Sequence, residues 1–177
     1  MIEGDFRHLY EALEGYGNEV RNLYQDNLVR ENKIASGELL NSVEFSVRTE
    51  DTAYVVSLRL ADYWKYVEGG TKGTESSPAG AVFKAHFPPV SALLSWIQVK
   101  PVLPRPDDKG RIPTPQQLAY LIGRKIERFG IEPAPALQKT LDELNAVWLP
   151  KITEAFARDC GEMIRRMTFD TFAAMTA

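Results

Sequence analysis

Few side chains in this chain are of the types and spacing that support catalysis or metal binding. Its 177 residues include one cysteine, Cys160, and two histidines, His8 and His86. These counts exclude an intrachain disulfide and disfavour a cysteine-based zinc site or a histidine-based triad. Residues 69–74 are rich in glycine but lack the spacing of a phosphate-binding loop. We therefore predict a protein that is not an enzyme and that uses no cofactor and no metal.

The carboxylates that stand out are Asp107, Asp108 and Glu68. Two adjacent aspartates supply fewer oxygen ligands than a hard cation requires, and Lys109 and Arg111 offset their charge, so we expect a solvated turn. Glu68 follows an aromatic cluster and precedes two glycines. We expect its carboxylate to accept backbone N–H bonds and cap the loop that follows, because no partner base for acid–base chemistry is evident.

The composition is that of an ordinary globular protein, with 44% hydrophobic and 25% charged residues and a net charge of −3. The modest excess of basic residues lies between positions 84 and 139. This is a weak electrostatic basis for nucleic-acid binding as a main activity. The acidic N-terminus has no apolar run, and no stretch of about 18 apolar residues occurs, so neither a signal peptide nor a membrane span is expected.

Hydrophobic periodicity predicts which elements position these residues. An apolar stripe at three- and four-residue steps favours a helix over residues 5–33, with a kink or break near Tyr16 because Gly15 and Gly17 lower helix stability. Alternating apolar residues before and after the polar turn at 49–52 predict a β-hairpin. Two strands alone are marginal in water, so further elements must cover one face.

The second half of the chain is expected to be mostly helical. Residues 62–68 favour a short helix or an edge strand, and residues 69–88 a long loop without regular structure. A capping box at Thr114–Gln117 begins one helix, and Gly130 ends it. The remaining predictions are a helix after Pro89 that ends before Pro101, a second exposed loop over 101–113, and helices over 136–149 and 151–175 that Pro150 separates or kinks. The fold class is therefore α+β, a small antiparallel hairpin-based sheet packed against N-terminal, middle and C-terminal helices.

Three short motifs occur in order along the chain. Gly37, Leu39 and Ser42 form a Gly-x-Leu-x-x-Ser stretch before the first strand, with Leu40 one place off. Tyr63, Val67, Glu68, Gly70 and Thr71 follow the hairpin, and Pro133, Pro135 and Leu137 stand before the last helix. These motifs resemble those of the tailed-phage head–tail joining, tail-completion or neck proteins. In that family the second motif is Tyr-x-x-x-Glu-x-Gly-Thr, from which this chain differs by one extra residue between Tyr63 and Glu68, and the third is Pro-x-Pro-Phe-Leu-like, with Ala136 here where the family tends to have Phe.

The resemblance covers most of residues 1–145 and implies a domain there, with residues 146–177 as a C-terminal helical extension. It implies a non-enzymatic virion protein, made in the bacterial cytoplasm, that forms a homo-oligomeric ring in the neck or tail. Its partners would be copies of itself, connector or adaptor proteins and tail-tube subunits, with no membrane and with DNA met only indirectly through the ring lumen. The motif residues would then be structural, and Glu68 would pin the turn.

Ring subunits meet through heterologous contacts, so exposed loops are the natural candidates for touching a neighbour. In the loops at 69–88 and 101–113 the candidate contact residues are Lys72, Thr74, Phe83, Arg105, Asp107, Asp108 and Arg111. One alternative is a bacterial nucleic-acid-associated or regulatory binding module, which needs one continuous basic face made by Lys100, Arg105, Lys109, Arg111, Arg124, Lys125 and Arg128. A small hydrolase is a third possibility, and it needs a concave pocket with converging polar groups.

Overall fold

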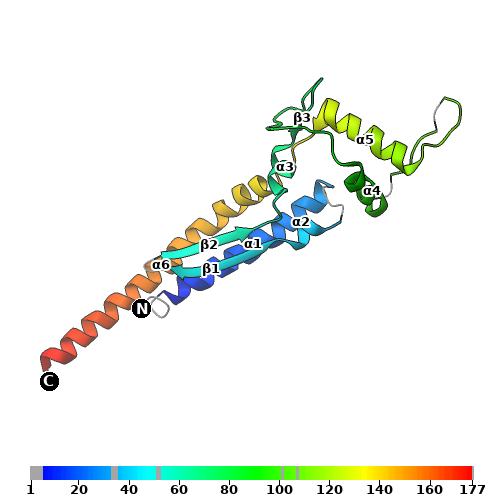
Figure 1. Cartoon of the computed structure of the whole chain (residues 1–177). Coiled ribbons are helices and arrows are strands. Elements are labelled where there is room, and N and C mark those ends of the chain that lie inside the picture. The colour runs from blue at the N-terminus through cyan, green and yellow to red at the C-terminus, as the bar shows by residue number, and fades with distance from the viewer. Residues whose placement is uncertain (1–5, 33–35, 51–52, 101, 107, 177) are drawn as a thin grey trace. The chain divides into compact units, whose positions relative to one another are not determined.

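The computed structural model describes residues 6–32, 36–50, 53–100, 102–106 and 108–176 (Figure 1). The chain divides into two compact units. Unit 1 contains Met1–Asp26, Val43–Arg59 and Lys139–Ala177, and unit 2 contains Asn27–Ser42 and Leu60–Gln138. Helices and two small sheets make up the structure, which confirms the predicted α+β class.

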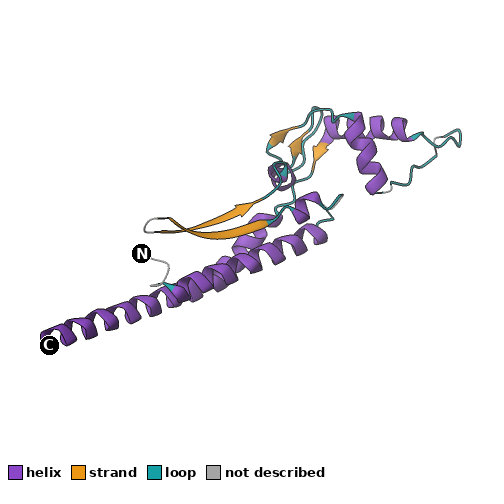
Figure 2. Cartoon of the chain, turned by 60° about the horizontal axis from the view of Figure 1, so that its bottom comes forward, coloured by secondary structure: helices purple, strands orange, loops and turns teal. Residues whose placement is uncertain are grey.

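Unit 1 combines two long helices with one hairpin. Helix α1 runs over Arg7–Arg30 and helix α6 over Ala136–Thr176, while strands β1 (Glu44–Glu50) and β2 (Ala53–Arg59) pair antiparallel from Glu44 opposite Arg59 to Glu50 opposite Ala53. Figure 2 shows the strands running alongside the long helices. The predicted hairpin is confirmed, although residues 51 and 52 of its turn lie outside the described residues.

Aromatic contacts hold unit 1 together. The rings of Phe6 and Phe156 stack with their centroids 5.7 Å apart, and that of Tyr54 on β2 lies 6.0 Å from that of Tyr10 on α1. The indole of Trp148 on α6 meets Tyr16 edge-on and donates a hydrogen bond of 2.6 Å from its Nε1 to Glu19. The apolar stripe of α1 thus packs against both the hairpin and α6.

The expected break near Tyr16 is wrong, because α1 is continuous through Gly15 and Gly17, and the alternative of a kink there stays a prediction. At both glycines the absence of a side chain instead allows an aromatic ring to pack directly on the helix backbone. A Cβ at Gly17 would lie 1.8 Å from the Phe45 ring, and one at Gly15 would lie 2.7 Å from the Trp148 ring. The expected separation into two helices at Pro150 is also wrong, since α6 passes through this residue as one helix, and the alternative of a kink there stays a prediction.

Unit 2 is built from short elements. Its helices are α2 (Glu38–Asn41), α3 (Trp64–Gly69), α4 (Val90–Val99) and α5 (Pro115–Phe129). Its sheet has the order β4-β3-β5, with β3 (Thr71–Lys72) parallel to β4 (Phe83–Lys84) and antiparallel to β5 (Gly130–Ile131).

Most predictions for unit 2 are confirmed. Residues 64–69 form a helix, and α5 begins with the predicted capping box, in which the Thr114 hydroxyl accepts from Gln117 N–H and the Gln117 side chain accepts from Thr114 N–H. The prediction of an unstructured loop over 69–88 is wrong in part, because this segment supplies β3 and β4. Its strands are only two residues long, too short to leave an alternating pattern in the sequence.

Gly17 provides a test of the aromatic packing in unit 1. Gly17→Ala should lower the free energy of unfolding by about 1–3 kcal/mol, because the new methyl group overlaps the Phe45 ring, although alanine favours a helix by about 1 kcal/mol. Gly161→Ala in α6 is the matched control, since nothing lies within 4 Å of its added Cβ. It should be neutral or stabilising. Urea denaturation followed by circular dichroism measures both, and equal effects would contradict the packing argument.

Candidate functional site

The three motifs, distant in the sequence, meet around α3 in unit 2. The Ser42 hydroxyl joins the first motif to the residues before the second, because its Oγ donates to Leu39 O at 2.9 Å and accepts from Ala61 N–H at 2.9 Å. Leu39 is buried, and Gly37 has φ 78°, a left-handed conformation that favours glycine. We call the assembly of residues 37–42, 61–71 and 130–138 the motif corner.

Tyr63 stands at the start of α3, against the first motif. Partial burial raises the pKa of its phenol and the nearby charge of Glu38 raises it further, while a hydrogen bond with the Leu39 backbone acts in the opposite direction. The phenol therefore stays protonated well above neutral pH. Its interactions with Glu38 and Leu39 connect the start of α3 to the first motif.

Glu68 joins the second motif to the third. Its carboxylate accepts hydrogen bonds from Leu137 N–H at 2.7 Å and from Gln138 N–H at 3.5 Å, in the first turn of α6. An anionic side chain there satisfies otherwise unpaired donors and complements the helix dipole. The prediction that Glu68 accepts backbone N–H bonds is confirmed, but the donors belong to a helix about 70 positions away and not to the adjacent loop. Beside it, Val67 O accepts from Ala134 N–H at 2.9 Å.

Gly70 and Thr71 complete the motif corner. The buried Thr71 accepts a hydrogen bond at its Oγ1 from Ile131 N–H at 3.0 Å. Gly70 has φ 58°, and a Cβ there would lie 2.5 Å from Ile131 O and 2.6 Å from Pro133 N. Pro133 is half-buried against this glycine, whereas Pro135 is exposed immediately before α6. Only glycine allows the two chain segments to approach this closely.

The structure separates the candidate contact residues into two groups. In the first, Lys72 and Thr74 are exposed, and Phe83 packs its ring 4.8 Å from that of Tyr66. Thr74 is tied to α5, because its N–H and hydroxyl both donate to Glu127 O, at 2.9 and 3.2 Å. This group belongs to the β4-β3-β5 sheet and its surroundings.

The second group lies in the connection between α4 and α5. Arg105, Asp108 and Arg111 are exposed, and Asp107 lies outside the described residues. The described part of this connection contains no helix or strand, as predicted. Two apolar residues that sequence reasoning missed are also exposed here, Leu103 at 90% and Ile112 at 66%. The sequence feature that could have identified them is an apolar residue directly before a proline in an otherwise polar loop.

A second feature that sequence reasoning missed lies in unit 1. The carboxylate of Asp159 on α6, only 2% exposed, accepts hydrogen bonds from His8 N–H at 3.2 Å, Leu9 N–H at 2.8 Å and His8 Nδ1 at 2.6 Å. Together with Glu162, these side chains place atoms of metal-ligating type within 4.8 Å of one another. Because three donors already engage Asp159, we assign it the capping of the first turn of α1.

Burial acts to raise the pKa of Asp159, but the hydrogen bonds from Leu9 and His8 outweigh it and hold the pKa below its ordinary value. A depressed pKa in the folded state stabilises the protein above the unfolded value of about 3.9, and this stabilisation is lost as the pH falls through the folded value.

Asp159→Asn should therefore lower the free energy of unfolding by about 1–3 kcal/mol at pH 7, with the difference from the unsubstituted protein shrinking below about pH 4. Glu162→Gln is the control, because its side chain is 42% exposed and its carboxylate lies 3.6 Å from Arg158. It should change stability by less than about 1 kcal/mol. Chemical denaturation at a series of pH values measures both, and a pH-independent loss in Asp159→Asn would count against the capping assignment.

The motif corner gives a further prediction. Gly70→Ala should destabilise the fold more than Gly110→Ala does, because both glycines have positive φ but only Gly70 has backbone atoms in the way of a Cβ. The strain common to both is about 1–2 kcal/mol, and the overlap at Gly70 adds about 1–3 kcal/mol. Thermal and urea unfolding of the two variants measure the difference. Equal losses would show that the close approach at Gly70 relaxes freely.

Comparison with protein-family models, with curated proteins and with solved structures gives no match. Among the described residues, no helix combines the length and the apolar character that crossing a membrane requires.

Proposed function

We propose that this chain is a non-enzymatic phage virion protein that joins head and tail or completes the tail as a subunit of a homo-oligomeric ring. The observation that carries the proposal is the motif corner. Its three motifs span residues 37 to 137, and hydrogen bonds at Ser42, Glu68 and Thr71 bring them to one place. This supports the resemblance, because residues that match one family also act together as one structural device.

The exposed connection between α4 and α5 supports self-assembly. Ring formation requires one surface of a subunit to meet a different surface of its neighbour. Leu103 and Ile112 present apolar side chains on a segment without regular structure, where a neighbour can cover them. The proposal extends to connector or adaptor and tail-tube proteins as partners, to a place in the virion neck or tail, and to DNA as a molecule met only through the ring lumen.

The charges on unit 2 favour this proposal over a nucleic-acid-associated module. Arg128 forms a bidentate ion pair with Glu75 at 2.5 and 2.7 Å, which raises the pKa of the guanidinium and lowers that of the carboxyl. Lys100 Nζ donates to the backbone and side-chain oxygens of Asn32, both at 2.9 Å. At least two of the seven basic residues that the alternative needs, Lys100 and Arg128, are thus engaged within the chain.

Mass photometry of the purified full chain over a range of concentrations tests the proposal, with electron microscopy of the concentrated protein. We expect particles of one defined multiple of the subunit mass and a ring-shaped outline, dissociating on dilution. Replacing Leu103 and Ile112 together by serine should raise the concentration needed for assembly while leaving the thermal midpoint unchanged. Leu149→Ser, at a residue 66% exposed on α6, is the matched control. A monomer at every concentration would contradict the proposal.

A further inference from the structure

We infer that the β1–β2 hairpin is the strand-pairing interface between neighbouring copies. In this arrangement the outer edge of β1 in one copy pairs antiparallel with the outer edge of β2 in the next. The register is the one that the two strands already use within a single chain, with Glu44 opposite Arg59. This inference rests on the proposed self-assembly and adds a second contact surface to the connection between α4 and α5.

The hairpin has two edges available for pairing. β1 and β2 are seven residues each and form a two-stranded sheet, which has no third strand in the described part of the chain. Each outer edge therefore carries N–H and C=O groups directed away from the partner strand, and long edges of this kind are templates for pairing with another chain. Glu44, Arg48, Val56 and Arg59 are all exposed along the hairpin.

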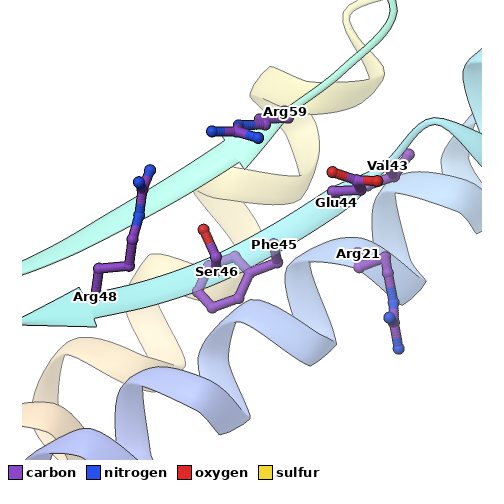
Figure 3. Close-up of a pocket in the computed structure, with 7 residues that line it drawn as sticks. All are labelled: Arg21, Val43, Glu44, Phe45, Ser46, Arg48 and Arg59. Atoms are coloured by element: carbon purple, nitrogen blue, oxygen red, sulfur yellow. The ribbon is translucent and has the colours of Figure 1, made fainter.

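A pocket lies beside β1 in unit 1. Its volume is about 440 Å³, and it is lined by Val43, Glu44, Phe45, Ser46 and Arg48, with Arg21 from α1 and Arg59 from β2. Figure 3 shows Phe45 directed toward the helices, while Ser46, Arg48 and Arg59 stand on the other side of the hairpin and the Arg21 guanidinium points away from them. Side chains from both faces of β1, together with Arg59 of β2, therefore line the pocket.

The side chains are complementary in the inferred register. Glu44 would face Arg59 of the next copy, Phe45 would face Leu58 and Val47 would face Val56, as within the hairpin, and no like charges stand opposite each other. In the described part of the chain neither Glu44 nor Arg59 forms an ion pair of its own. Their charges therefore remain available to a neighbour.

A head-to-tail pairing also fits a ring better than a two-fold pairing does. Joining β1 to the neighbour's β2 uses two different edges, so every added copy leaves one edge of each kind free until the assembly closes. Pairing β1 with β1 about a two-fold axis through Val47 would instead place Glu44 opposite Glu50 at both ends of the contact. Because it uses β1 alone, it would close at a dimer and leave the β2 edge of each copy unpaired.

Charge reversal with mixing tests the inference. Glu44→Arg alone and Arg59→Glu alone should each raise the concentration for half-assembly by about tenfold, because like charges then face each other between copies. Mixing the two variants in equal amounts should restore assembly, because a contact between one chain of each variant again sets an arginine opposite a glutamate. Each variant also sets like charges opposite each other within its own hairpin. Mixing leaves that pair unchanged, so restored assembly would report on the contact between copies. Glu50→Arg is the control, since Ala53 stands opposite it, and it should assemble normally.

Disulfide trapping is the second measurement, and it does not depend on the charge variants folding well. In a Cys160→Ser background, a Ser46→Cys chain mixed with a Ser57→Cys chain should give covalent heterodimers on mild oxidation, because these positions face each other in the register. Each single-cysteine chain alone should give far fewer covalent dimers. Equal yields from the mixture and from the separate chains would overturn the register.

The outcomes distinguish the two proposals. If the unsubstituted chain forms rings and both charge variants assemble as it does, the hairpin inference is overturned and the proposed function stands. If the unsubstituted chain stays monomeric, the proposed function is contradicted, and the hairpin inference that rests on it fails as well. If Glu44→Arg fails while Arg59→Glu assembles normally, copies pair through β1 alone, and the head-to-tail arrangement is wrong.

Discussion

The contact on which unit 2 depends is the capping of α6 by the Glu68 carboxylate. The first turn of a helix has N–H groups without partners, and Glu68 supplies an anionic acceptor to two of them. This joins α3 to a segment about 70 positions later in the chain. The backbone bond between Val67 and Ala134, the Thr71 hydroxyl and the close approach at Gly70 act at the same place, so that α3, β3 and β5 are positioned together.

Unit 1 repeats the same device with different residues. There the buried Asp159 of α6 caps the first turn of α1, and the aromatic rings of Phe45 and Trp148 rest on glycines of that helix. The carboxylate must lie close to the N–H groups at the helix start, because a buried charge without partners destabilises the fold. The position beneath each ring must be glycine, because an added methyl group would overlap the ring. These contacts explain how a hairpin of two strands, marginal on its own, is held on a helical pair.

The candidate interaction surfaces are the parts that these devices leave uncovered. The connection between α4 and α5 exposes apolar side chains, and the hairpin exposes two strand edges of complementary sequence. The buried and hydrogen-bonded residues of the motif corner hold its shape.

Local pattern determined much of the secondary structure. The alternation around Val47 and Val56, and the capping box at Thr114 and Gln117, act over a few residues and predicted the hairpin and the start of α5 correctly. The preference of Glu68 for backbone donors was also evident from its neighbours.

Tertiary contacts decided the features that depend on residues far apart in the sequence. Gly15 and Gly17 do not break α1, because rings from β1 and α6 occupy the space beside them, and the donors to Glu68 and Asp159 come from helices far away in the sequence. Strands of two residues form only because other segments offer them partners. The sequence pattern therefore could not predict β3 and β4.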